Sequence, residues 1–288
     1  MGLKLLPKGV IVDVVTPLFS DNSLDTKTYT RILKHVLKDA QMILIASPRK
    51  GQGTSLDITT RLKMLELSLG LIDNTKIVFF YITFGRSEDV FKIIYELNNF
   101  DKNNNLKDTI VLTDAPLYYH SNRGLVDLYK VMTSLTKFSF CLYNDPKLIA
   151  HLNVILKRQN IRTSILKDLA KMDEILGIIS YGSFLRINNY EKAVRFRPEF
   201  RVYEGEELRF ADFPNRSGVV SALANISPKT WQLIANYSLG LDRFDEGAGL
   251  EAQLFRLVQE AKAMSQYLEI PDSQLLEKIL AEIPLDKG

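Results

Sequence analysis

The sequence predicts a parallel α/β barrel of eight strands, a (β/α)8 fold, followed by a C-terminal helical extension. Eight short, apolar, β-rich runs recur along residues 9–222, and segments with apolar residues at helical spacing separate most of them. Continuous apolar runs such as 77–80 are typical of strands that helices cover on both faces, as in parallel sheets. Eight such units within about 220 residues favour a closed barrel over an open, doubly wound sheet.

Each element is expected from its own pattern. Apolar side chains at helical spacing, such as Tyr29, Ile32 and Val36, predict the helices between strands. The expected strands cover residues 9–16, 42–46, 76–82, 109–113, 138–143, 175–180, 200–203 and 218–222. After residue 222 the pattern becomes helical only, over 228–239, 249–268 and 272–283. We therefore expect a barrel over 1–226 and a helical cap over 227–288, packed on the barrel without a linker.

Composition excludes several classes of protein. The 288 residues are 46% hydrophobic and 25% charged, with a net charge of +3 spread along the chain, so no basic block favours nucleic-acid binding. No apolar stretch approaches the roughly 20 residues that cross a bilayer. The one cysteine, Cys141, lies in an apolar run and cannot form a disulfide within the chain, which favours a buried thiol and a cytoplasmic location.

Neither a cofactor nor a metal is expected. The three histidines are far apart in sequence, with no pair at the spacing of metal ligands. Gly51-Gln52-Gly53 imitates the start of a dinucleotide-binding loop, but Leu56 stands where the third glycine belongs.

Candidate functional residues follow from the fold, because barrel enzymes place reacting groups at the carboxyl ends of their strands. After the second strand, Arg49 and Lys50 are expected to bind an anionic ligand, together with Gly51. Tyr143 ends the fifth strand. Gly205 follows the seventh strand and Val220 lies in the eighth, and both are expected to contact the ligand. The acidic run 204–207 could supply carboxylates, although a charged helix start explains it equally well.

Several motifs, in order, resemble one family. Each motif is weak on its own, but together, in this order and at this spacing, the motifs make the resemblance specific. They are Val15-Thr16-Pro17-Leu18, Ala115-Pro116-Leu117-Tyr118-Tyr119, Leu142-Tyr143-Asn144-Asp145-Pro146 and Gly218-Val219-Val220-Ser221-Ala222. On them the chain resembles the dihydrodipicolinate synthase and N-acetylneuraminate lyase family of class I, pyruvate-dependent aldolases. The resemblance implies a (β/α)8 barrel and a homotetramer built from tight dimers, with Tyr118 and Tyr119 near a subunit contact.

The resemblance also implies a chemistry that this chain lacks in part. In the family, a lysine of the sixth strand forms a Schiff base with a 2-oxo acid, and a tyrosine of the fifth strand relays protons. The tyrosine carries over to Tyr143, but the lysine position falls on Ile179, which has no amine. The family's Gly-Thr-Thr-Gly turn is represented by 48–51 without its hydroxyls, and a carboxylate-binding arginine falls on Leu148.

Three hypotheses of function remain. The leading one is a family member inactive in the aldol or lyase reaction, which binds a small anionic metabolite, a 2-oxo acid or sugar acid, through Arg49, Lys50 and Tyr143. A second is an active lyase that uses Lys50 as a relocated nucleophile or needs no imine. A third is a structural or partner-binding oligomer whose mouth is filled by Ile179 and Leu148.

Overall fold

The computed structural model describes residues 3–73, 75–101, 106–152, 158–241 and 250–283. It confirms the predicted fold: eight parallel strands form a closed barrel in the order β1 to β8. Among the described residues, none of the helices is both long enough and apolar enough to span a membrane.

The eight strands fall within two residues of the predicted ranges at most ends, and the first is three residues shorter than expected. They are β1 (Gly9–Asp13), β2 (Met42–Ile45), β3 (Ile77–Tyr81), β4 (Ile110–Asp114), β5 (Ser139–Asn144), β6 (Ile175–Ser180), β7 (Arg201–Glu204) and β8 (Gly218–Ser221). Every strand residue except Arg201 is buried. This burial agrees with the prediction that the strands are covered on both faces.

The helices follow the strands in alternation. The α-helices are α1 (Thr26–Val36), α2 (Ile58–Leu69), α3 (Ser87–Asp101), α4 (Leu125–Leu135), α5 (Pro146–Ala150), α6 (Thr163–Leu169), α7 (Phe184–Ala193), α8 (Glu207–Asp212), α9 (Pro228–Leu239), α10 (Leu250–Ala263) and α11 (Asp272–Glu282). Short 3-10 turns are η1 (Leu106–Asp108), η2 (Pro116–Tyr118), η3 (Leu223–Asn225) and η4 (Met264–Leu268). The helix predicted over 249–268 is thus α10 followed by η4, and residue 249 lies outside the described residues.

The chain divides into two compact units. The first unit comprises Met1–Pro7 and Ile77–Gly205, and the second comprises Lys8–Lys76 and Glu206–Gly288. This division differs from the predicted one at residue 226, which stays a prediction. The C-terminal helices belong to the same unit as β1, β2 and β8.

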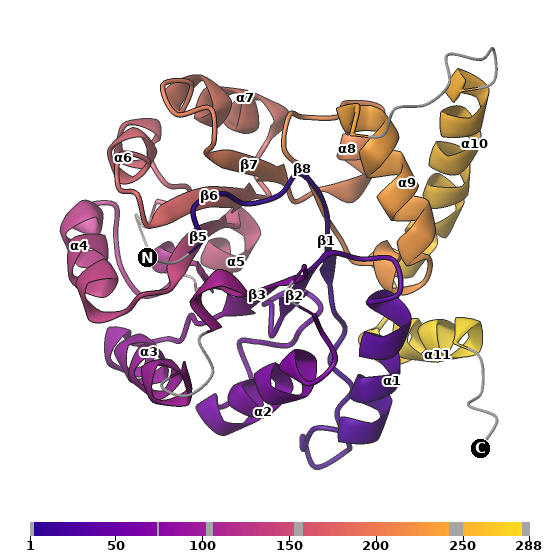
Figure 1. The fold of residues 1–288 in the computed structure, drawn as a ribbon, viewed down its shortest axis with the longest axis horizontal. Helices are drawn as coiled ribbons and strands as arrows, with labels where there is room; N and C mark the ends of the chain where they lie inside the picture. The colour runs from indigo at the N-terminus through magenta and orange to yellow at the C-terminus, as the bar shows by residue number, and fades with distance from the viewer. Residues whose placement is uncertain (1–2, 74, 102–105, 153–157, 242–249, 284–288) are drawn as a thin grey trace. The chain divides into compact units, whose positions relative to one another are not determined.

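In the first unit, β3 to β7 pair in sequence order, and α3, α4, α6 and α7 lie outside them (Figure 1). The N-terminal segment is fixed to the amino ends of these strands by side chains. The Ser139 hydroxyl donates to the carbonyl of Leu3 at 2.8 Å, and the Arg201 Nε donates to the carbonyl of Leu6 at 2.9 Å. Cys141 lies buried in β5, as predicted.

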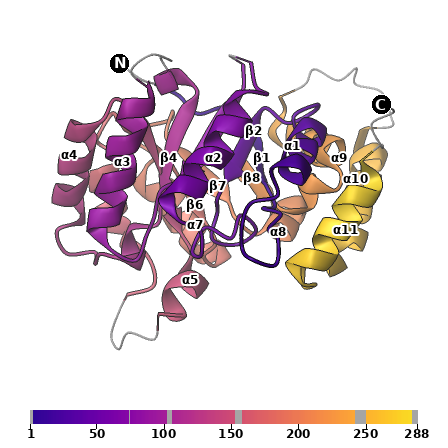
Figure 2. The ribbon, with the colours of Figure 1, turned by 90° about the horizontal axis from the view of Figure 1, so that it is seen from below.

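In the second unit, β1 pairs with β2 on one side and with β8 on the other. Helix α9 packs on β1 and β8, and α10 packs against α9 (Figure 2). Asn225 fixes the end of β1, because its Nδ2 donates to the carbonyl of Asp13 at 2.7 Å. Gly218 has a φ of 134°, and a Cβ there would lie 1.9 Å from the carbonyl oxygen of Gly9, so β1 and β8 approach closely only because residue 218 is glycine.

Candidate functional site

A tight loop after β2 carries the two cations that the sequence singled out. The Ser47 hydroxyl accepts hydrogen bonds from the backbone N–H groups of Lys50 at 3.2 Å and Gly51 at 3.0 Å. A Cβ at Gly51 would lie 2.2 Å from the backbone nitrogen of Ser47, so only glycine fits there. The loop therefore holds Arg49 and Lys50 in a defined position at the carboxyl end of β2.

Arg61 of α2 supports this loop from within the protein. Its side chain is 1% exposed, and its guanidinium donates to the carbonyl oxygens of Leu56, at 3.3 Å, and Gly53. A buried guanidinium that satisfies backbone carbonyls ties the loop to the helix. Arg61 therefore positions the loop that carries Arg49 and Lys50.

Each of the two cations already has a carboxylate partner. Arg49 Nη2 lies 3.4 Å from Glu206 Oε1, at the start of α8, and Lys50 Nζ lies 3.1 Å from Asp272 Oδ1, at the start of α11. The side chains of Arg49 and Lys50 are 28% and 13% exposed, so these pairs are partly shielded from water. A ligand carboxylate would have to compete with Glu206 and Asp272 for these two cations.

Asp13, the last residue of β1, is a buried carboxyl beside these pairs. Its side chain is 2% exposed, and its Oδ1 accepts no hydrogen bond from any described residue. Burial raises the pKa of Asp13 to about 7, because the charged form loses its hydration. The Ser47 hydroxyl and the charges of Arg49 and Lys50 lower this pKa, and the charge of Asp272 raises it. We call Asp13, Ser47, Arg49, Lys50, Glu206 and Asp272 the charged cluster.

The burial of Asp13 predicts a pH-dependent effect of the substitution Asp13→Asn. The folded state holds the proton up to about pH 7 and the unfolded state only up to 3.8, so in this window the unsubstituted protein loses stability as pH rises. Asparagine does not titrate. Asp13→Asn should therefore be more stable than the unsubstituted protein at pH 8, by on the order of 2 kcal/mol, and this gain should shrink toward pH 4. Urea unfolding at the two pH values measures the difference; a gain independent of pH would contradict it.

Glu207 is a second buried carboxyl of the same unit, but it is fully engaged. Its oxygens accept hydrogen bonds from the Ser221 hydroxyl and from the N–H groups of Ala222, at 3.1 Å, and Leu223, at 3.2 Å. Burial raises its pKa to about 7, these hydrogen bonds lower it, and the charge of Asp13 raises it slightly. Within the acidic run 204–207, Glu206 therefore pairs with Arg49, and Glu207 accepts hydrogen bonds from the N–H groups at the start of η3.

In the first unit, Tyr143 and Ile179 occupy paired positions of β5 and β6, so their side chains lie on one face of the sheet. The Tyr143 ring lies 5.6 Å from that of Tyr81, edge to face, and 5.2 Å from that of Tyr181. Ile179 is fully buried, and both Tyr143 and Tyr181 are nearly so. These residues form a closely packed, largely aromatic layer.

Gly205 is required by this aromatic layer. A Cβ at Gly205 would lie 2.5 Å from the Tyr181 ring, so any larger residue would push the ring aside. Val220 lies in β8, buried and paired with Ile11 of β1. The predicted ligand residues are thus divided: Arg49, Lys50, Gly51 and Val220 lie in the second unit, and Tyr143, Ile179 and Gly205 lie in the first.

Asp114, at the end of β4, is a buried carboxyl with a full set of donors. The hydroxyls of Thr83, at 2.6 Å, and of Tyr119 and Tyr129, both at 2.8 Å, donate to it. Burial raises its pKa and the hydroxyls oppose that shift. Tyr119, which the resemblance places near a subunit contact, therefore has a partner within the chain. The contact itself stays a prediction.

Sequence reasoning missed Asp13, Arg61 and Asp272. A signal for Asp13 was available, because a carboxyl inside an apolar run that is buried on both faces is costly and calls for an explanation. No local signal marks Asp272, which is 222 residues from Lys50 in the chain.

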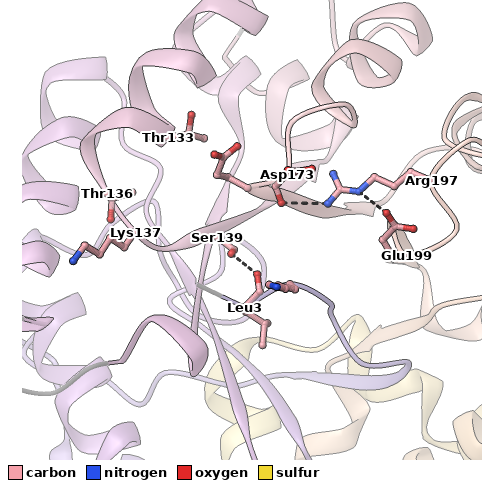
Figure 3. Close-up of a pocket in the computed structure, with 10 residues that line it drawn as sticks. Leu3, Thr133, Thr136, Lys137, Ser139, Asp173, Arg197 and Glu199 are labelled. Carbon is pink, nitrogen blue, oxygen red and sulfur yellow. Dashed lines mark hydrogen bonds and ion pairs between the residues drawn. The ribbon is translucent and has the colours of Figure 1, made fainter. Parts of the chain in front are cut away.

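A cavity of about 480 Å³ lies at the other end of the strands in the first unit, around the amino ends of β5 and β6 (Figure 3). Arg197 forms part of its wall and donates to the carbonyl oxygens of Ala170, Met172, Asp173 and Ile175. Barrel enzymes carry their chemistry at the carboxyl ends of strands, so this cavity is not part of the candidate site.

The fold and the charged cluster define a (β/α)8 barrel protein with charged groups at the carboxyl ends of its strands. No model of a known protein family matches the chain. It is 23% identical over 241 residues to 4-hydroxy-tetrahydrodipicolinate synthase of Thermotoga maritima, covering 81% of this chain and 76% of the relative. The corresponding synthase of Methanosphaera stadtmanae is 22% identical over 263 residues, covering 87% and 82%.

Among solved structures, dihydrodipicolinate synthase of Acinetobacter baumannii, complexed with pyruvate, matches with a TM-score of 0.75 at 16% identity, over 97% of this chain and 90% of that one. This likeness shows the fold. The sequence relatives and the fold together support membership of the dihydrodipicolinate synthase and N-acetylneuraminate lyase family.

Proposed function

We propose that this chain is a family member that forms no Schiff base on β6 and binds a small anionic metabolite, a 2-oxo acid or sugar acid. Arg49 and Lys50 would hold the ligand's carboxylate, and the predicted role of Tyr143 stays a prediction. The observation that carries the proposal is the pair of partly buried cations at the end of β2, beside the buried carboxyl of Asp13. Positive groups in a shielded position bind anions more strongly than groups in open water.

The loss of the Schiff base is supported by the side chain present on β6. Ile179 stands where the resemblance puts the lysine, it has no amine, and it is fully buried. Imine formation needs the lone pair of a neutral amine at the site of attack. Isoleucine cannot supply it.

The relocated-nucleophile alternative receives little support from Lys50. Its amino group already donates to the carboxylate of Asp272 at 3.1 Å, so a ketone would have to displace this contact before Lys50 could attack it. The scaffold alternative is favoured by the aromatic layer, because Ile179 is fully buried at the position paired with Tyr143. Leu148, the other residue expected to fill the mouth, is half-buried.

Binding measurements on charge variants test the proposal. Arg49→Ala and Lys50→Ala should each weaken the binding of pyruvate about tenfold, the value of one charge-assisted hydrogen bond. Glu206→Gln and Asp272→Asn should strengthen it, because each removes the carboxylate that competes with the ligand. Isothermal titration with pyruvate, other 2-oxo acids and sugar acids gives the dissociation constants.

Lys130→Ala is the matched control, because Lys130 lies on the surface in a pair with Asp127. It should leave the dissociation constant unchanged. If no compound of the panel binds the unsubstituted protein, the proposal of metabolite binding is wrong and the result favours the scaffold alternative. A homotetramer, a cytoplasmic location and the lack of a nucleic-acid or membrane partner stay predictions.

A further inference from the structure

Asp13 differs from two other buried carboxyls, those of Asp114 and Glu207. Asp114 accepts from three hydroxyls, and Glu207 accepts from one hydroxyl and two N–H groups. Asp13 is equally buried, yet its Oδ1 accepts no hydrogen bond from the described residues. A buried acceptor without a donor lowers stability, so its presence calls for a role that offsets this cost.

The surroundings of Asp13 fix its position and enclose that oxygen without giving it a donor. The residue's backbone carbonyl accepts from Asn225. The groups that act on Asp13 are Ser47, Arg49 and Lys50 of the loop after β2 and Asp272 of α11. The charge of Asp13 in turn raises the pKa of Glu207 of α8. Lys50 donates to Asp272, and the Ser47 hydroxyl accepts from two N–H groups, which leaves its proton for the Asp13 carboxyl.

We infer that Asp13 is a catalytic base for an imine-free enolisation of a 2-oxo acid that Arg49 and Lys50 hold. This inference rests on the proposed function and names both a reaction and the residue that carries it. The cluster offers cations for a carboxylate or a carbonyl oxygen, and one buried carboxylate oxygen able to accept a proton. Both are needed to remove a proton from the carbon beside a carbonyl.

The step balances without any further reactant. Asp13 Oδ1 takes a proton from carbon 3 of the 2-oxo acid, and the electrons of that C–H bond form a double bond between carbons 2 and 3. The carbonyl π electrons move to the oxygen on carbon 2, where Lys50 or Arg49 stabilises the enolate charge. Return of the proton from Asp13 to carbon 3 restores the 2-oxo acid. In deuterated water, exchange at Asp13 replaces the proton with a deuteron before its return.

The pH dependence of this exchange follows from the same carboxyl. Burial raises the pKa of Asp13 to about 7, near the range in which a general base works best. Only the deprotonated carboxylate of Asp13 can accept the proton, so the exchange rate should rise with pH up to about 7 and then level off. Arg49 and Lys50 lower this pKa and Asp272 raises it, so Asp272→Asn should move the midpoint to lower pH.

Proton NMR in deuterated water tests the inference, with pyruvate as the probe. The unsubstituted protein should speed the loss of the methyl signal above the buffer rate, and Asp13→Asn should slow this exchange at least about tenfold. Asparagine keeps the shape of aspartate, so pyruvate binding measured by titration should change less than twofold. Asp168→Asn, which alters an exposed carboxylate paired with Lys171, is the control that should leave exchange unchanged.

The outcomes separate this inference from the proposed function. Binding of pyruvate without exchange, or exchange that Asp13→Asn leaves intact, overturns the role of Asp13 and leaves the binding proposal standing. Absence of binding overturns both. An adduct trapped by borohydride during exchange would assign the reaction to an imine and overturn the inference. If Asp13→Asn does not fold, the pH profile decides: a midpoint near 7 that Asp272→Asn lowers supports Asp13, and a rate without such a midpoint overturns it.

Discussion

Incubation with pyruvate and borohydride is expected to leave every lysine of the unsubstituted chain unmodified, whereas Ile179→Lys should acquire a pyruvate adduct at residue 179. The reason is the environment of that position. Residue 179 is fully buried at a position paired with Tyr143, and desolvation disfavours the charged form of a lysine there. A neutral amine on β6 is the group that attacks a ketone.

Intact-mass measurement followed by peptide mapping locates the adduct. Ile178→Lys is the matched control, because residue 178 is equally buried but neighbours on a strand point to opposite faces. It should remain unmodified. A stable adduct on the unsubstituted chain, at Lys50 or at another lysine, would show that the protein is an active imine-forming enzyme and would overturn the proposed loss of the Schiff base.

Arg61→Met is expected to lower the free energy of unfolding by about 3 kcal/mol and to weaken pyruvate binding more than tenfold. Methionine fills much of the same space but donates no hydrogen bond. The carbonyl oxygens of Gly53 and Leu56 would then lose a buried donor, and the loop that carries Arg49 and Lys50 would lose its support.

Urea unfolding and isothermal titration measure the two effects on the same samples. Arg195→Met, at an exposed arginine, is the control and should change neither quantity. A variant that loses stability but binds pyruvate normally would show that Arg61 supports the fold alone. A variant unchanged in both would contradict the role of its hydrogen bonds.

The charged cluster makes ligand binding a competition between carboxylates. Arg49 and Lys50 each face a carboxylate of this chain, so an incoming anion exchanges one ion pair for another. Such an exchange contributes only a modest free energy of binding, because the ion pairs of the free protein already compensate much of the positive charge of Arg49 and Lys50. Affinity for a 2-oxo acid therefore depends on groups that match the rest of the ligand.

The strands were predictable because their signal is local. A strand buried on both faces needs a continuous apolar run, and each of the eight runs became a strand within a few residues of its predicted ends. The first strand is shorter than its run because pairing with β8 ends at Val12 and with β2 at Asp13, and residues 14–16 turn toward the loop after β2. The apolar run alone does not show at which residue the backbone pairing between strands ends.

Helix α2 shows where apolar spacing misleads. Of the leucines at 62, 65, 67 and 69, only Leu65 belongs to the buried face, which otherwise carries Arg61, Met64 and Ser68. Arg61 and Ser68 are buried because hydrogen bonds satisfy them: Arg61 with the loop after β2, and Ser68 with the carbonyl of Met64 at 2.8 Å. A polar residue that finds its partners in the tertiary structure carries no apolar signal in the sequence.

The barrel, the positions of Arg49, Lys50 and Tyr143 at strand ends, and the isoleucine at 179 could be predicted, because these depend on residue type and local periodicity. Which charges meet depends on the packing of distant segments. Glu206 lies 157 residues from Arg49 and Asp272 lies 222 residues from Lys50, and folding alone brings each pair within 3.4 Å. The packing also buries Asp13 and leaves its Oδ1 without a donor among the described residues, because desolvation and hydrogen bonding depend on every segment that packs around a group.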